Sequence, residues 1–193
     1  MPGSSPMVVK IIRGAPGVGK STIAQKVASK LSTNKVAHIS VDALQHFDCR
    51  AAASKDKLKL GVFHAVLVTR SFISEGFSVV VDYVFDENLD FFIEKLFKSH
   101  SHELAPCRVQ VFYLDASIEV LKSRNASRPD PMPEEILTKL YDRINKTRGV
   151  LGCEVVLDAG AKNASPGSLA KTIVSCDSGG WTAWESGDQP FAS

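Results

Sequence analysis

Short apolar runs alternate along this chain with longer segments in which apolar residues recur every three or four positions. The runs are rich in β-branched residues, as strands buried in a parallel sheet usually are. Five strands are therefore predicted, at residues 7–12, 35–41, 77–83, 107–115 and 154–160. The periodic segments between them predict helices at residues 20–31, 56–76, 87–100, 134–147 and 168–174, with one more beginning at residue 117.

This alternation predicts the fold class. Strands that alternate with helices form a parallel sheet with right-handed crossovers and helices on both faces, which is a three-layer α/β fold. Ligands of such sheets bind at the carboxyl ends of the strands. Residues 124–135 interrupt the pattern, because Pro129, Pro131 and Pro133 forbid both helix and strand. This proline segment joins two helices, carries Arg124 and Arg128, and is interpreted as a lid.

Residues 1–174 are predicted to form one domain, and residues 175–193 a C-terminal tail. The tail is rich in Ser and Gly, which is typical of disorder, although Trp181 and Trp184 could also dock on the domain. The tail holds three acidic residues and no Lys or Arg, so the chain's formal charge of +2 becomes +5 for residues 1–174. That mild excess suits a protein that handles phosphates.

The composition narrows the class of protein. With 44% hydrophobic and 23% charged residues, the chain is typical of a soluble globular domain. Its four cysteines lie far apart without a CxxC pair, which argues against a zinc site and favours reduced thiols in the cytoplasm. We expect a cytoplasmic protein, since there is no signal-peptide pattern and no apolar run near the roughly 20 residues of a membrane helix.

The stretch GAPGVGKS, after the first predicted strand and before the first predicted helix, satisfies the pattern GxxxxGK[ST]. Backbone N–H groups of such a loop converge on a β-phosphate, Lys20 adds positive charge between the β- and γ-phosphates, and the Ser21 hydroxyl is a ligand for Mg²⁺. The expected nucleotide-binding residues are Gly14, Ala15, Pro16, Gly17, Val18, Gly19, Lys20, Ser21 and Thr22.

Other motifs indicate the class of P-loop protein. A GTPase would need a guanine-reading NKxD, and the stretches NKVA and NKTR lack the Asp. A motor ATPase usually has a strand that ends in Asp-Glu, whereas here Asp82 is followed by Tyr83. A kinase of small molecules or nucleosides fits better, because such enzymes have about this length and an Arg-bearing lid that closes over the phosphates.

The chain resembles the P-loop kinase group that contains phage-type polynucleotide kinase, the chloramphenicol phosphotransferases and the zeta-toxin kinases. The resemblance spans roughly residues 7–174. Three segments carry it: the loop with Lys20 and Ser21, the stretch ISVD that places Asp42 after the second strand, and RNASRPDPMPEEILTKLYDRI. The stretch VVVDYVF is also similar to the chloramphenicol phosphotransferases.

The places of the charged residues along the chain, together with the resemblance, imply their roles. Asp42 matches the general base, although an Asp at this place could also cap a helix. Asp82, at the same sheet edge, would hold Mg²⁺ through water or contact the acceptor, or would be a turn carboxylate. Arg128 would reach the transferring phosphate, and Arg124 would pack over the adenine. The chain departs from the polynucleotide kinases at Gln45, where they have an acceptor-gripping Arg.

These features predict an enzyme that uses ATP and Mg²⁺ and phosphorylates a hydroxyl group of a small molecule, with Lys20, Asp42 and Arg128 as catalytic residues. A polynucleotide 5′-hydroxyl kinase is the first alternative, favoured by the lid pattern. A nucleotide-binding regulatory module without transfer activity is the second. The acceptor pocket is expected between residues 44–50 and 59–73.

Overall fold

The computed structural model describes residues 7–33, 35–45, 55–98, 107–149, 154–177 and 181–183. Its elements in chain order are β1 (Met7–Gly14), α1 (Lys20–Ala28), β2 (Val36–Ser40), α2 (Val41–Leu44), α3 (Lys55–Ser74), β3 (Ser78–Asp82), α4 (Leu89–Lys98), β4 (Cys107–Asp115), α5 (Ile118–Ala126), α6 (Glu134–Lys146), β5 (Val155–Asp158), α7 (Pro166–Ser175) and β6 (Trp181–Ala183). Within these residues no helix is both long and apolar enough to cross a membrane.

The five predicted strands form a parallel sheet in the order β2-β3-β1-β4-β5, which confirms the predicted fold class. The strand that continues into the glycine loop, β1, lies at its centre. A sixth strand, β6, pairs antiparallel with the start of β4, where Cys107 lies opposite Ala183. Because β6 belongs to residues 175–193, part of the predicted tail joins the sheet, and the domain boundary at residue 174 stays a prediction.

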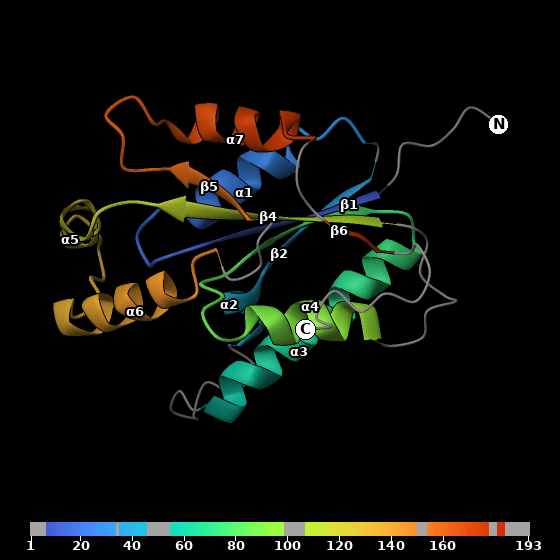
Figure 1. Ribbon diagram of the computed structural model, residues 1–193, viewed down its shortest axis with the longest axis horizontal. Helices are drawn as coiled ribbons and strands as arrows, with labels where there is room; N and C mark the ends of the chain where they lie inside the picture. Colours follow the sequence, from blue (N-terminus) through green and yellow to red (C-terminus); the bar gives the residue numbers. More distant parts are fainter. Residues whose placement is uncertain are drawn as a thin grey trace.

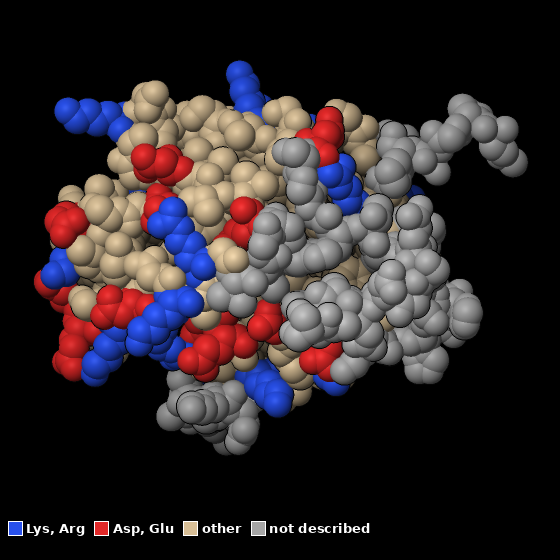
Figure 2. Space-filling view, viewed as in Figure 1, with Lys and Arg blue, Asp and Glu red and all other residues tan. Residues whose placement is uncertain are grey.

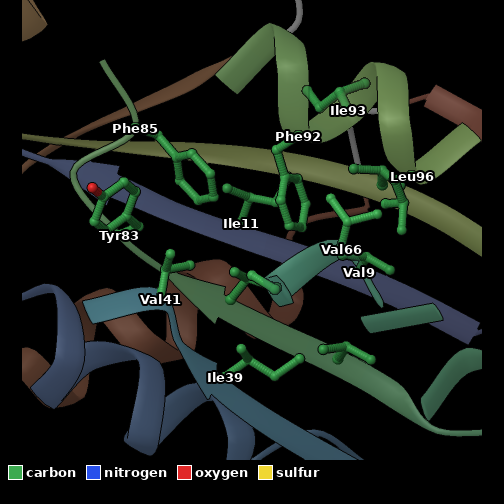
Figure 3. Packing of buried hydrophobic residues seen from close by; sticks show 14 of the residues in the cluster. Val9, Ile11, Ile39, Val41, Val66, Tyr83, Phe85, Phe92, Ile93 and Leu96 are labelled. Carbon is green, nitrogen blue, oxygen red and sulfur yellow. The ribbon is translucent and has the colours of Figure 1, made fainter. Parts of the chain in front are cut away.

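Helices cover both faces of the sheet (Figure 1), with α1 and α7 on one face and α3 and α4 on the other. Side chains of a strand alternate between the faces, so Val9 and Ile11 pack under α3 and α4 while Ile12 packs under α1 and α7. Figure 3 shows the first of these two cores, in which Phe85 and Phe92 lie beside Ile11. The carboxyl ends of the strands are thereby held rigidly at one edge.

Some element boundaries differ from the prediction. The helix expected at residues 20–31 ends at Ala28, and α2 is a short helix that the apolar pattern did not indicate. The helix predicted to begin at residue 117 is capped by Ser117, whose hydroxyl accepts from the Val120 N–H at 3.4 Å. The proline segment is irregular only over residues 127–133, so Arg124 lies in the last turn of α5.

Candidate active site

The glycine loop connects β1 to α1 at the carboxyl edge of the sheet. A Cβ at Gly14 would lie 2.6 Å from the carbonyl oxygen of Leu114, so only glycine lets β1 and β4 approach this closely. Gly19 has φ +101°, precedes α1, and offers no side chain to cap the helix. The N–H groups at the start of α1 therefore have no side-chain cap, as an anion-binding helix N-terminus requires.

Lys20 is the electrostatic centre of this region. Its side chain is buried, with 8% exposed, and Nζ donates to the Ala15 carbonyl at 3.1 Å. Burial lowers the pKa of Lys20 to about 8; the carboxylates of Asp42 and Asp82 act to raise it, and Arg128 lowers it further. Three residues that the sequence analysis singled out, from three different segments, thus lie close enough to Lys20 to influence its charge.

Asp82 ends β3 and is completely buried. The Ser21 hydroxyl donates to its Oδ2 at 2.7 Å, and Nε2 of His38 lies 2.6 Å from its Oδ1. A hydroxyl beside a carboxylate is an oxygen donor set that suits Mg²⁺. Among the described residues no three His, Cys, Asp or Glu side chains gather at one point, so an ion here would take its other ligands from phosphates and water.

The predicted roles gave no part to His38. Its contact with Asp82 depends on β2 lying next to β3, with Ser40 in register with Asp82. The two strands are far apart in sequence, so the contact could be found only once the strand order was known.

Asp42 lies in the first turn of α2, where Ser40 and not Asp42 holds the N-cap position. Asp42 is therefore not the N-cap residue of α2. The Asp42 side chain is exposed, as a group that meets an incoming acceptor should be.

Gln45 closes α2 and contacts two neighbours. Its amide donates to the Tyr83 hydroxyl at 2.8 Å, and it packs so closely on α3 that a Cβ at Gly61 would lie 2.4 Å from its Cγ. Burial raises the pKa of Tyr83; the Gln45 bond and Arg143 lower it, and Asp42 and Asp86 raise it. The phenol of Tyr83 thus lies at the edge of the core beside Phe85 (Figure 3), within the field of the groups around Asp42.

A second link joins α6 to the loop after β3. Arg143 on α6 forms an ion pair of 2.7 Å with Asp86, whose side chain is largely buried, and Asn88 donates to the other Asp86 oxygen at 3.3 Å. The charge of Arg143 is therefore matched by a carboxylate.

The loop and the segment after β5 line an open pocket of about 230 Å³. It is lined by Gly17, Val18, Gly19, Thr22, Ile23, Arg124, Ala159, Ala164, Pro166 and Leu169. The guanidinium of Arg124 donates to the Val18 carbonyl at 3.4 Å and to the Ala159 carbonyl at 2.8 Å, which ties the loop to β5. The lining is mostly apolar, as the pocket for a flat heteroaromatic ring needs to be.

The irregular lid carries Arg128, whose side chain is exposed. The lid is closed at its base by Asn125, a residue that the sequence analysis did not single out. The Asn125 amide donates to the Met132 carbonyl at 2.7 Å and accepts from the Met132 N–H at 3.1 Å. The backbone N–H and carbonyl of Met132 are thus both bonded to the buried side chain of Asn125.

Comparison with known proteins agrees with this geometry. The model of a protein family described as an AAA domain matches residues 9–148, which is more than half of the chain. The fold is similar to that of a sugar kinase from Janibacter sp. HTCC2649, with 18% identity and a TM-score of 0.64 over 88% of this chain and 93% of that chain.

Two further structures are similar. One is a gluconokinase from Sinorhizobium meliloti 1021, with 18% identity and a TM-score of 0.61 over 88% of this chain and 91% of that chain. The other is a chain of the Pnkp1/Rnl/Hen1 RNA repair complex, with 15% identity and a TM-score of 0.57 over 77% of this chain and 47% of that chain. At these identities the likeness concerns the fold, and it confirms the P-loop kinase-like fold predicted from the sequence.

Proposed function

The chain belongs to this AAA domain family, and we propose that it is an ATP- and Mg²⁺-dependent kinase that phosphorylates a hydroxyl group of a small molecule. One observation carries the proposal: Asp42, Asp82 and the lid residue Arg128 all act on the buried charge of Lys20 at the carboxyl edge of the sheet. A loop with Lys20 alone would suit any nucleotide-binding protein. A base candidate and a lid arginine beside it favour transfer over mere binding.

The pocket beside the loop supports ATP as the nucleotide. The loop and the start of α1 would hold the β- and γ-phosphates, and the base would enter the pocket against Arg124. None of the ten lining residues is acidic, so no carboxylate there accepts from the N1–H and N2–H₂ groups of guanine. This lining favours adenine.

The transfer itself follows from the placement of charges. Asp42 accepts the proton of the acceptor hydroxyl while the hydroxyl oxygen bonds to the γ-phosphorus. The bond from the γ-phosphorus to the bridging oxygen breaks, and ADP leaves. Lys20 and Arg128 neutralise the charge on the phosphoryl oxygens. A magnesium ion, when bound at Ser21 and, through water, at Asp82, would supply further neutralisation of the phosphates.

The acceptor side favours a small hydroxyl compound over nucleic acid. Near the Tyr83 phenol the described groups include the Gln45 amide and the carboxylates of Asp42 and Asp86, and the partner of Asp86 is Arg143. Amide, phenol and carboxylate groups recognise hydroxyls, whereas carboxylates repel phosphodiesters. On the face that Figure 2 shows, Lys and Arg are interspersed with Asp and Glu over α5 and α6, without a basic stripe among the described residues.

The test is transfer from γ-labelled ATP, with Mg²⁺, to a panel of sugars, nucleosides and hydroxyl-bearing antibiotics, run beside a 5′-hydroxyl oligonucleotide. We expect label on a small molecule. We expect Asp42→Asn to lower the transfer rate by about 10²–10⁴-fold while ATP affinity stays unchanged. Label on the oligonucleotide alone would make the protein a polynucleotide kinase. ATP binding without transfer to any acceptor would favour the regulatory module, and unchanged turnover in Asp42→Asn would remove Asp42 from the mechanism.

A further inference from the structure

We propose that His38 is a positioning residue for the magnesium site: it fixes the orientation of the Asp82 carboxylate, so that the other carboxylate oxygen is reserved for Ser21 and the ion. The inference rests on the proposed function. It concerns how this chain prepares its metal site.

The two oxygens of the Asp82 carboxylate have different hydrogen-bond partners. An ionised carboxylate only accepts, so the imidazole donates from Nε2 to Oδ1 over 2.6 Å, while Ser21 donates to Oδ2 over 2.7 Å. Asp82 is 0% exposed, and a buried carboxylate needs such partners in place of water. The bond from His38 therefore satisfies the oxygen that faces away from Ser21.

The sheet explains why the imidazole reaches this oxygen. On β2, Ala37 and Ile39 pack in the core under α3 and α4, so His38 projects from the opposite face, where Asp82 and α1 lie. His38 is in register with Val80, two residues before Asp82. Its side chain is 22% exposed, so the imidazole bridges from the sheet edge to the buried carboxylate.

The consequence concerns Ser21. Because its hydroxyl hydrogen points at Oδ2, its oxygen lone pairs remain available to an ion on the nucleotide side. If Oδ1 lost its donor, the carboxylate could turn, and the Ser21 hydroxyl would lose its fixed direction. Partners that orient metal ligands in this way typically change metal affinity by about 10–100-fold.

The experiment compares wild type with His38→Leu and His38→Gln. Gln can place its amide nitrogen near the position of Nε2 and restore the donor, whereas Leu fills space without one. The ADP complex of each protein is titrated with Mn²⁺, and free Mn²⁺ is followed by electron paramagnetic resonance, so no acceptor or turnover is needed. ADP affinity in EDTA and the melting temperature are measured beside it.

We expect His38→Leu to weaken Mn²⁺ binding by about 10-fold or more, with ADP affinity in EDTA unchanged, and His38→Gln to stay within about 3-fold of wild type. Equal Mn²⁺ affinity in all three proteins would overturn the role of His38, as would equal losses in both variants that follow their melting temperatures. If the wild type binds no nucleotide, the proposed function fails and this inference falls with it. If it binds nucleotide and Mn²⁺ but transfers no phosphate, only the proposed function fails.

Discussion

Replacing Lys20 with Met should make the nucleotide-free protein more stable while it destroys nucleotide binding. Lys20 is a buried cation, and burial lowers its pKa from 10.5 to about 8. Below pH 8 it is charged in both the folded and the unfolded chain, and the folded state bears the cost of burying it. The difference between the two pKa values corresponds to about 3 kcal/mol at pH 7.

The expected gain is smaller than that cost, because Met also loses the hydrogen bond to the Ala15 carbonyl. That bond contributes about 1 kcal/mol, which leaves a net gain of about 2 kcal/mol at pH 7. For a chain of this size the gain corresponds to a rise of about 4–8 °C in the melting temperature. Between pH 8 and 10.5 the unfolded chain binds more protons than the folded one, so wild-type stability rises with pH. At pH 10 the advantage of Lys20→Met should therefore be close to zero.

Urea unfolding at pH 7 and pH 10, with and without ATP, measures both effects. ATP at 100 times its dissociation constant should stabilise wild type by about 2.7 kcal/mol and leave Lys20→Met unchanged. The control is Lys26→Met, an exposed position on the same helix, which should keep the ATP effect and wild-type stability. A Lys20→Met variant that is less stable than wild type at pH 7, or whose gain does not depend on pH, would refute the argument that Lys20 is a buried charge kept for its ligand.

Three further outcomes follow from the same contacts. ATP affinity measured by calorimetry should fall about tenfold from pH 7 to pH 9, because the charged fraction of Lys20 falls from about 90% to about 10% when its pKa is about 8. A flat profile would contradict this lowering of the Lys20 pKa. In wild type, Gly61→Ala should be neutral or destabilising by up to about 2 kcal/mol, because the new Cβ would lie 2.4 Å from the Gln45 Cγ. In a Gln45→Ala background that contact is gone, and Gly61→Ala should stabilise the protein by about 1 kcal/mol. Equal effects in the two backgrounds would show that Gln45 does not limit this position. Asn125→Ala should cost about 1–3 kcal/mol in urea unfolding, since both polar groups of Met132 lose their partner, whereas Ser127→Ala should cost less than 1 kcal/mol.

The sequence was sufficient wherever the signal is local. Glycine spacing, the Lys-Ser pair and the flanking strand and helix identified the phosphate-binding loop, because its conformation depends on neighbouring residues. The rule that ligands meet the carboxyl ends of parallel strands also predicted that Asp42 and Asp82 would face one site, and both act on Lys20. That rule needs only the strand boundaries.

The missed side-chain contacts depend on the partner that a residue acquires across the fold. His38 contacts Asp82 because β2 lies beside β3, and Gln45 contacts Tyr83 because α2 packs against both α3 and the end of β3. No periodicity encodes the strand order. The strand β6 was missed for a different reason, because its three residues give too short an apolar pattern to mark a strand.

The central strand β1 ends next to a buried charge that bears on the site. Arg13, directly before the loop, is 1% exposed, and its guanidinium donates to the Thr147 carbonyl and hydroxyl and pairs with Glu154 at 3.0 Å. Tyr113, from the neighbouring strand, donates to Asn145 at 2.7 Å. These bonds anchor the C-terminal end of α6 to the two central strands. Because a helix is stiff, anchoring that end also fixes the place of Arg143, one turn before Thr147, against the loop that follows β3. The cost of burying the charge of Arg13 beside the loop is partly offset by these hydrogen bonds and by the ion pair with Glu154.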